Sequence, residues 1–215
     1  MPRLRPETLH ARREHILDAA ERCFAQYGFH RCTMAMICAE AGISAGALYA
    51  HFRSKEALIE GISERDRADL ALQFANVIKA PDLTAALAQI AEHYAVDEPQ
   101  FKRVLTAEIG LEATRNDTVR EIFDSVDQFV LQSLVQVVER SRQEGRIAPD
   151  YDSRTLSELL LLIGEGLMWR RAVAPDFNVK ALLPVIINVI ETLLKPESHR
   201  TGAKSSEPVD FEGDA

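Results

Sequence analysis

The stretch from Thr33 to Leu58, TMAMICAEAGISAGALYAHFRSKEAL, decides how the N-terminal part of the chain folds. It predicts two short helices that meet at the turn Gly42-Ile43-Ser44. Gly42 can adopt the positive φ that ends the first helix, and Ser44 can cap the second. The apolar side chains expected to face inward are Ile37, Ala41, Leu48 and Phe52. The pattern predicts a helix-turn-helix, whose second helix enters the major groove of DNA.

The outer face of the second predicted helix suits contact with DNA. Its first turn, Ala45-Gly46-Ala47, has no bulky side chain that would hold the helix away from the groove. The free amide groups of that turn can approach phosphate. Tyr49 and His51 are expected to project outward, and Lys55 opens the next helix. A partly packed Tyr49 and a merely solvated His51 are the alternative interpretations.

Charge is unevenly distributed along the chain. The 215 residues carry a formal net charge of −8. Residues 1–55 hold eight lysines and arginines against five acids, a net charge of +3, whereas the other 160 residues have a net charge of −11. A basic end on an acidic body can present one face to phosphates while the body repels DNA.

Residues 12–58 resemble the DNA-binding domain of the TetR family of bacterial transcriptional regulators. The matching positions are Tyr27-Gly28, Thr33, Ile37-Cys38, Ala41-Gly42-Ile43-Ser44, Gly46, Leu48-Tyr49, His51-Phe52 and Ser54-Lys55-Glu56-Ala57-Leu58. Cys38 departs from the family pattern, in which alanine is usual. The resemblance implies phosphate contacts for Thr33, Ser44, Tyr49 and Lys55, and places Ala45, Gly46 and His51 nearest the base edges.

The rest of the chain predicts helices throughout, so the expected fold class is all-α with about nine helices. Helices are expected to end at Gly28, to run from 55 to about 79, and to span 84–95, 100–114, 118–145, 153–173 and 179–195. We predict a three-helix helix-turn-helix domain at 1–55, a helical ligand-binding and dimerisation domain at 56–195, and a disordered tail at 196–215. The helix from Lys55 to about Lys79 is expected to link the two domains and to be the only element that touches both.

Two sets of residues in the C-terminal domain are candidates for binding. Among the ligand candidates, core packing is the alternative for the apolar residues, and a solvated face is the alternative for Glu108. The candidate ligand-binding residues are Phe101, Leu105, Glu108, Phe129, Met168 and Trp169. The candidate dimer residues form two apolar stripes, Leu156, Leu160, Ile163 and Leu167 on one helix and Leu183, Ile187 and Ile190 on the next. The resemblance implies that the last two long helices pair across a two-fold axis as a four-helix bundle.

Several classes of protein and site are disfavoured by the sequence. It contains no His-Glu-x-x-His, Gly-rich phosphate loop or serine elbow, so we do not expect an enzyme or a cofactor. Cys23, Cys32 and Cys38 match no zinc signature, and no metal site is expected. Small buried thiols are the favoured interpretation of these cysteines, and a redox sensor is the alternative. No signal peptide or membrane-spanning apolar run is present, which predicts a cytoplasmic protein without a membrane partner.

Together these observations predict a transcriptional regulator that binds a palindromic operator in double-stranded DNA as a homodimer. An unidentified small-molecule effector is expected to release it, since repression with release is the commoner behaviour of the family. The rival interpretations are an all-α protein-interaction module and an enzyme without a recognisable motif. An interaction module should expose apolar side chains between Ser44 and His51, where this chain has small and polar ones.

Overall fold

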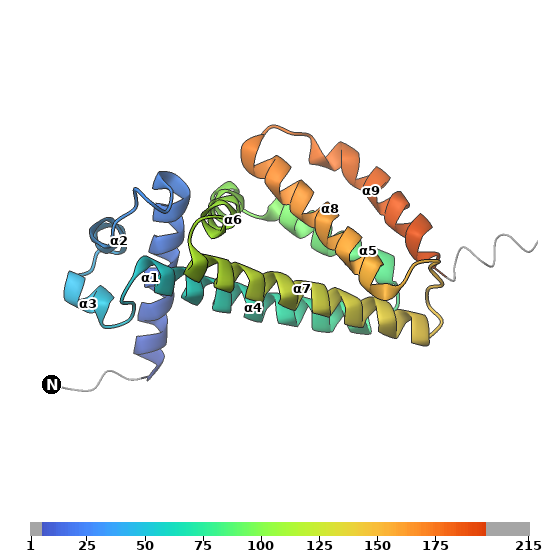
Figure 1. The fold of residues 1–215 in the computed structure, drawn as a ribbon, viewed down its shortest axis with the longest axis horizontal. Coiled ribbons are helices and arrows are strands. Elements are labelled where there is room, and N and C mark those ends of the chain that lie inside the picture. The colour runs from blue at the N-terminus through green and yellow to red at the C-terminus, as the bar shows by residue number, and fades with distance from the viewer. Residues whose placement is uncertain (1–5, 197–215) are drawn as a thin grey trace, which may run out of the picture.

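The computed structural model describes residues 6–196, and this part of the chain has the expected all-α fold (Figure 1). Its elements are α1 (Pro6–Tyr27), α2 (Met34–Ala41), α3 (Ala45–Tyr49), α4 (Lys55–Lys79), α5 (Leu83–Glu92), the π-helix η1 (His93–Asp97), α6 (Gln100–Ala113), α7 (Asp117–Gln143), α8 (Ser153–Val173) and α9 (Val179–Leu194). Of the predicted tail, Pro196 pairs with Ile147 in an isolated antiparallel bridge, and 197–215 lie outside the described residues.

Side-chain caps explain where most of these helices begin. The capping residues, each accepting a hydrogen bond from the amide three positions later, are Thr33, Ser44, Ser54, Asp82, Asn116, Asp152 and Asn178. Such a cap satisfies an amide that has no partner inside its helix and stabilises the helix by about 1 kcal/mol. The cap expected at Ser44 is therefore confirmed.

The predicted helix over 84–95 is interrupted. The α-helix ends at Glu92, and the next turn widens into η1, where the amide of Glu98 donates to the carbonyl of His93 at 2.8 Å. Proline disfavours a helical backbone at the residue before it, and Glu98 leaves the helix with ψ 132° directly before Pro99. The expectation of one continuous α-helix was therefore wrong from His93 onward.

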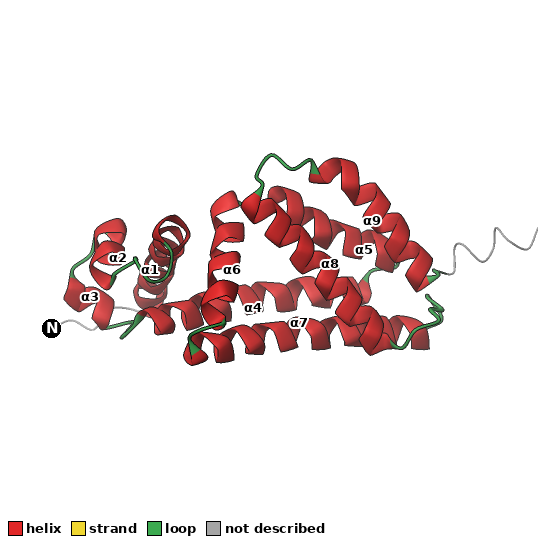
Figure 2. Cartoon of the chain, turned by 45° about the horizontal axis from the view of Figure 1, so that its top comes forward, coloured by secondary structure: helices red, strands yellow, loops and turns green. Residues whose placement is uncertain are grey.

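The helices form two groups that α4 joins. Figures 1 and 2 show α1, α2 and α3 at one end of the molecule, and α4 leaving them to run beside α7. The remaining helices α5, α6, α8 and α9 lie over this pair. None of the described helices combines the length and the hydropathy needed to cross a membrane.

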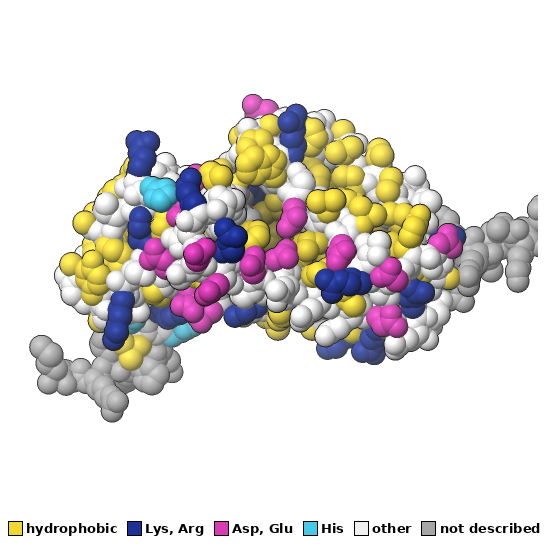
Figure 3. All heavy atoms as spheres, in the orientation of Figure 1, with side chains coloured by type: hydrophobic (Ala, Val, Ile, Leu, Met, Phe, Trp, Pro, Cys, Tyr) yellow, Lys and Arg dark blue, Asp and Glu magenta, His cyan; other side chains and the backbone are white. Residues whose placement is uncertain are grey.

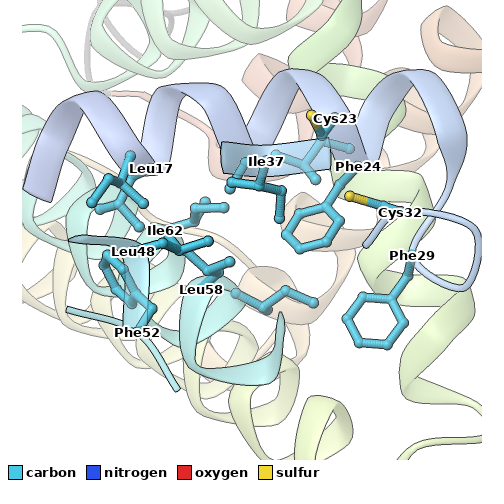
Figure 4. Packing of buried hydrophobic residues seen from close by; sticks show 14 of the residues in the cluster. Leu17, Cys23, Phe24, Phe29, Cys32, Ile37, Leu48, Phe52, Leu58 and Ile62 are labelled. Atoms are coloured by element: carbon cyan, nitrogen blue, oxygen red, sulfur yellow. The ribbon is translucent and has the colours of Figure 1, made fainter. Parts of the chain in front are cut away.

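The first hydrophobic core extends beyond the N-terminal helices. Its buried residues come from α1 to the start of α4, among them Leu17, Phe24 and Leu58 (Figure 4). Leu105 of α6 and Val119 of α7 belong to the same cluster. Two further clusters lie among the helices from α4 to α9. The first core is thus shared by the N-terminal helices, α4, α6 and α7, and α1 packs against both α6 and α4.

Candidate DNA-binding surface and effector cavity

The turn between α2 and α3 has the backbone conformation that the sequence predicts. Gly42 lies in the left-handed region with φ 61°, and its amide donates to the carbonyl of Ala39 at 3.2 Å. The amide of Ile43 donates to Cys38 at 3.0 Å. The hydroxyl of Ser44 then accepts from the amide of Ala47 at 3.3 Å. These bonds determine where α2 ends and where α3 begins.

The inner face of α3 is anchored in the first core. Ile37 and Leu48 are fully buried, and Ala41 and Phe52 nearly so, which confirms the inward-facing set. Leu48, Phe52 and Leu17 belong to this core, and Figure 4 shows them at the same end of it. A Cβ at Gly61 of α4 would lie only 2.9 Å from Phe52, so glycine is what permits α4 to approach this closely.

The outer face of α3 is open. Ala45, Gly46 and Tyr49 are exposed, and a Cβ at Gly46 would meet nothing within 4 Å. Tyr49 is 52% exposed, which favours an outward hydroxyl over a packed ring. His51 is half-buried, with its ring centre 6.5 Å from that of Phe52. Thr33 is exposed at the start of α2.

Lys55 makes contacts that the sequence did not predict. Its ammonium donates to the backbone carbonyl of Phe29 and lies 4.2 Å from the centre of the Phe29 aromatic ring. The α1–α2 loop is thereby held to the start of α4. A phosphate contact by Lys55 stays a prediction, and it requires the ammonium to share or leave these partners.

The cysteines are buried, and their chemistry favours the packing interpretation. Burial raises the pKa of Cys32 to about 12 and also raises the pKa of Cys23. Because the thiolate is the reactive form, these thiols are weak nucleophiles at neutral pH. Their surroundings therefore disfavour the redox-sensor alternative.

Comparisons with known proteins agree with this geometry. The sequence model for bacterial regulatory proteins of the tetR family matches residues 16–62. The chain is 31% identical over 156 residues to the HTH-type transcriptional regulator UidR of Escherichia coli K12, covering 73% of this chain and 79% of UidR. It is 30% identical over 204 residues to the HTH-type transcriptional repressor Rv1474c of Mycobacterium tuberculosis, covering 88% and 98%.

The fold comparison leads to the same family. The solved structure of GusR from Salmonella enterica superposes with a TM-score of 0.75 at 30% identity, covering 86% of this chain and 96% of GusR. The chain belongs to the TetR family. It is a DNA-binding transcriptional regulator, and the relatives matched here are regulators rather than enzymes.

Two adjoining cavities lie among the helices from α4 to α8 or α9 of this TetR-family chain, and α1 also borders the smaller one. The smaller, about 310 Å³, is called the acidic cavity because its lining includes Glu21, Asp66, Asp69, Glu98, Asp127 and Glu165. The larger, about 640 Å³, is called the apolar cavity, and residues of α4 to α9 line it, including Phe74, Leu134 and Trp169. Tyr94, Phe123 and Met168 line both cavities. Volumes of this size are typical of small-molecule sites.

Three of the six candidate ligand residues line these cavities. Leu105 lines the acidic cavity, Trp169 the apolar cavity, and Met168 both. The other three candidates, Phe101, Glu108 and Phe129, line neither.

The helical period explains these three exceptions. Positions 101 and 108 share the face of α6 that meets the N-terminal helices, where Glu108 accepts a bond from the amide of Phe29 at 3.4 Å. The cavity-lining residues of α7 recur at 123, 126, 127, 130 and 134, and Phe129 is rotated by about 100° from Val130. The prediction for these three residues is corrected accordingly.

Two carboxylates of the acidic cavity have raised pKa values although both side chains remain partly exposed. Burial is the main cause that raises the pKa of Asp66, even though Lys102 and Arg65 oppose the shift. Burial and the neighbouring Asp127 raise the pKa of Glu165. Lys102 lies between three acids, at 3.9 Å from Glu21, 4.0 Å from Asp66 and 3.9 Å from Glu98.

The apolar residues of α8 and α9 divide into an inner and an outer face. Of the predicted dimer residues, Leu156, Leu167, Leu183 and Ile190 are buried within the protomer, and Leu160, Ile163 and Ile187 are half-buried. The four buried residues pack against the protomer's own core and cannot face a partner, so the predicted stripe is corrected. The large exposed apolar side chains of the two helices are Leu159, Leu162, Trp169, Val173, Leu182, Val185 and Val189. We call this set the α8–α9 face, and Figure 3 shows hydrophobic side chains gathered over that region.

Helix α6 also touches the N-terminal domain, contrary to the expectation that only α4 would. Glu112 is 1% exposed and lies 3.0 Å from the imidazole of His30 and 2.8 Å from Arg115. On α4, Arg65 reaches α1, with its guanidinium 2.5 Å from Glu21 and 2.8 Å from Asp18. Helices α4 and α6, which are among those that line the cavities, therefore both contact the DNA-binding end.

Proposed function

We propose that this regulator is a cytoplasmic, dimeric repressor that binds a palindromic operator and leaves it when a small molecule fills the cavities. The observation that carries the proposal is the open outer face of α3, which presents Ala45, Gly46 and Tyr49 at one end of the molecule (Figure 1). Small side chains there let the backbone approach a groove, and the polar groups around them suit phosphates. The proposed phosphate partners are Thr33, Ser44, Tyr49 and Lys55. The residues proposed to lie nearest the base edges are Ala45, Gly46 and His51.

A second copy of the chain is the proposed partner for the α8–α9 face. Contiguous exposed apolar surface marks an interaction site, and a two-fold axis suits two half-sites of a palindrome. Gly166 lies one helical turn before Trp169 on α8 and is exposed. A Cβ at Gly166 would have nothing within 4 Å, so a helix of the second copy can approach closely there. In such a dimer, the buried apolar residues of α8 and α9 would stay packed in the core of their own protomer. The α8–α9 face would be covered by the same face of the second copy.

The proposed release mechanism uses α4 and α6. A dimer reads half-sites about 34–36 Å apart, one helical turn of DNA. A ligand shifts the equilibrium only by its differential affinity for the binding and released spacings. Lowering operator affinity 100-fold requires the ligand to favour the released form by about 2.7 kcal/mol. A molecule in the cavities would contact both α4 and α6, the two helices that are bonded to the N-terminal helices. This arrangement supports a release mechanism that acts through α4 and α6.

Selection of bound duplexes from random DNA tests the proposal. The expected result is an inverted repeat with half-sites one helical turn apart, bound by the wild-type protein. Gly46→Glu is the matched control, because the site is open and the added carboxylate would repel phosphates without disturbing the core. A folded wild-type protein that enriches no sequence would contradict the proposal and favour a protein-interaction module.

A further inference from the structure

Arg103 is a buried charge at the wall of the apolar cavity. Its side chain comes from α6, is 4% exposed, and lines the cavity of about 640 Å³. The guanidinium donates to the carbonyl of Tyr94 at 3.2 Å and makes a long contact of 3.5 Å with Gln100. Neither partner is charged, so these contacts leave the positive charge uncompensated.

The charges around Arg103 do not neutralise it. Among residues 9–196 no carboxylate lies within the ion-pair distance of 4.0 Å of this guanidinium. The carboxylate of Glu98 is the favourable charge nearby, and it is shared with Lys102 at 3.9 Å and His93 at 3.7 Å. Burial, and next the guanidinium of Arg171, lower the pKa of Arg103. A buried charge without a partner is costly, and a counter-ion supplied by a ligand would remove that cost.

The remaining wall of this cavity is apolar. Among the described residues that line it, the charged side chain other than Arg103 is Glu165, which lines both the apolar and the acidic cavity. Side chains such as Phe74, Leu134 and Ile186 surround the rest of the space. A ligand that fits must therefore be mostly apolar and must carry one group that can accept hydrogen bonds from a guanidinium.

We infer that the effector is an anionic amphiphile whose carboxylate pairs with Arg103 while its apolar body fills the apolar cavity. The inference rests on the proposed function and specifies its effector. Arginine and carboxylate form two parallel hydrogen bonds in a planar fork, which gives this pair both strength and orientation. The site is distinct from the acidic cavity, whose carboxylates would repel the same headgroup.

A headgroup series on the full-length protein tests the inference. Decanoate, 1-decanol and decylammonium share an apolar chain and differ in charge. Binding is measured at neutral pH by calorimetry and by the fluorescence of Trp169, the one tryptophan of the chain, which lines the apolar cavity. Decanoate is expected to bind about 10- to 100-fold more tightly than decanol, because it adds a charge-assisted hydrogen bond.

Substitution of Arg103 separates ligand pairing from a structural role at the Tyr94 carbonyl. Arg103→Met should lower decanoate affinity to that of decanol and leave decanol affinity unchanged, whereas Arg140→Met, at an exposed pair with Glu144, should change neither. If Arg103→Met does not fold, Arg103→Lys keeps the charge and loses the fork, and should retain only part of the preference for decanoate.

Two results would overturn the inference. One is equal affinity of the wild-type protein for decanoate and decanol. The other is tighter binding of decylammonium that Glu165→Gln abolishes, since the cavity would then accept cations at its acidic side. Operator binding without ligand is measured on the same samples. Intact operator binding with no headgroup preference therefore refutes the effector class alone, whereas absent operator binding refutes the proposed function.

Discussion

The DNA-binding end and the cavity region of this protein are built on different principles. The candidate DNA contacts lie within the 23 residues from Thr33 to Lys55, and caps and a glycine turn fix their geometry locally. The apolar cavity draws its wall from positions between Leu70 and Ile190, on every helix from α4 to α9. The first region depends on local chain chemistry, whereas the second depends on how long helices are rotated against one another.

This difference should appear most strongly in the energetic cost of removing a phenylalanine. Phe52 under α3 and Phe74 on α4 are 4% and 5% exposed, but only Phe74 borders the apolar cavity. Phe52→Ala is expected to lower the free energy of unfolding by about 4–5 kcal/mol, and Phe74→Ala by about 3 kcal/mol, because a side chain beside an existing cavity loses fewer contacts. Urea unfolding of the wild-type protein and of both variants measures the two losses of unfolding free energy. An equal or larger loss for Phe74→Ala would contradict the contrast.

The same contrast decides what the sequence could and could not predict. Thr33, Gly42 and Ser44 act on their own neighbours, so residue type was enough to place α2 and α3. Along α8, by contrast, apolar residues occupy every position from Leu159 to Ile163, and periodicity cannot tell an inner face from an outer one. Lys102-Arg103 looks like a solvated charged pair in sequence. Arg103 is buried because η1 and the end of α8, where Gln100 bonds to Ala172, close over it.

The second test concerns dimer formation through the α8–α9 face, which lies on the outer side of the cavity region. Val185→Glu places a charge on the α8–α9 face, where the native side chain is 57% exposed, so the protomer should fold normally. We expect sedimentation to show a monomer at micromolar concentration and operator affinity to fall at least 100-fold, about 2.7 kcal/mol. Leu72→Glu, at a leucine of α4 that is 67% exposed, is the control and should remain dimeric. A wild-type monomer at that concentration would refute the proposed dimer.

A smaller effect is expected from a pair of glycines, one in each region. Gly42 has φ 61° and Gly145, after α7, has φ 73°, and neither has an atom within 4 Å of a built Cβ. Replacing either by alanine should cost about 1–2 kcal/mol of unfolding free energy through backbone strain alone. Only Gly42→Ala should also weaken operator binding, because it distorts the turn that sets α3. Equal loss of operator affinity in Gly145→Ala would show that the two regions are not separable in this way.

The smallest expected effect is at Lys55, at the start of the helix that links the DNA-binding end to the cavity region. A phosphate contact predicts that Lys55→Gln weakens binding to all DNA sequences about equally and flattens the slope of log K against log salt by about one unit. The contacts with Phe29 instead predict a loss of roughly 1 kcal/mol in unfolding free energy with an unchanged slope. We expect the flatter slope, because the ammonium lies at the start of α4 beside the α1–α2 loop and can contact phosphate from there. Salt titrations on operator and on unrelated DNA, with urea unfolding of the same variant, distinguish the outcomes. An unchanged slope together with lower stability would assign Lys55 to the packing of the loop rather than to DNA.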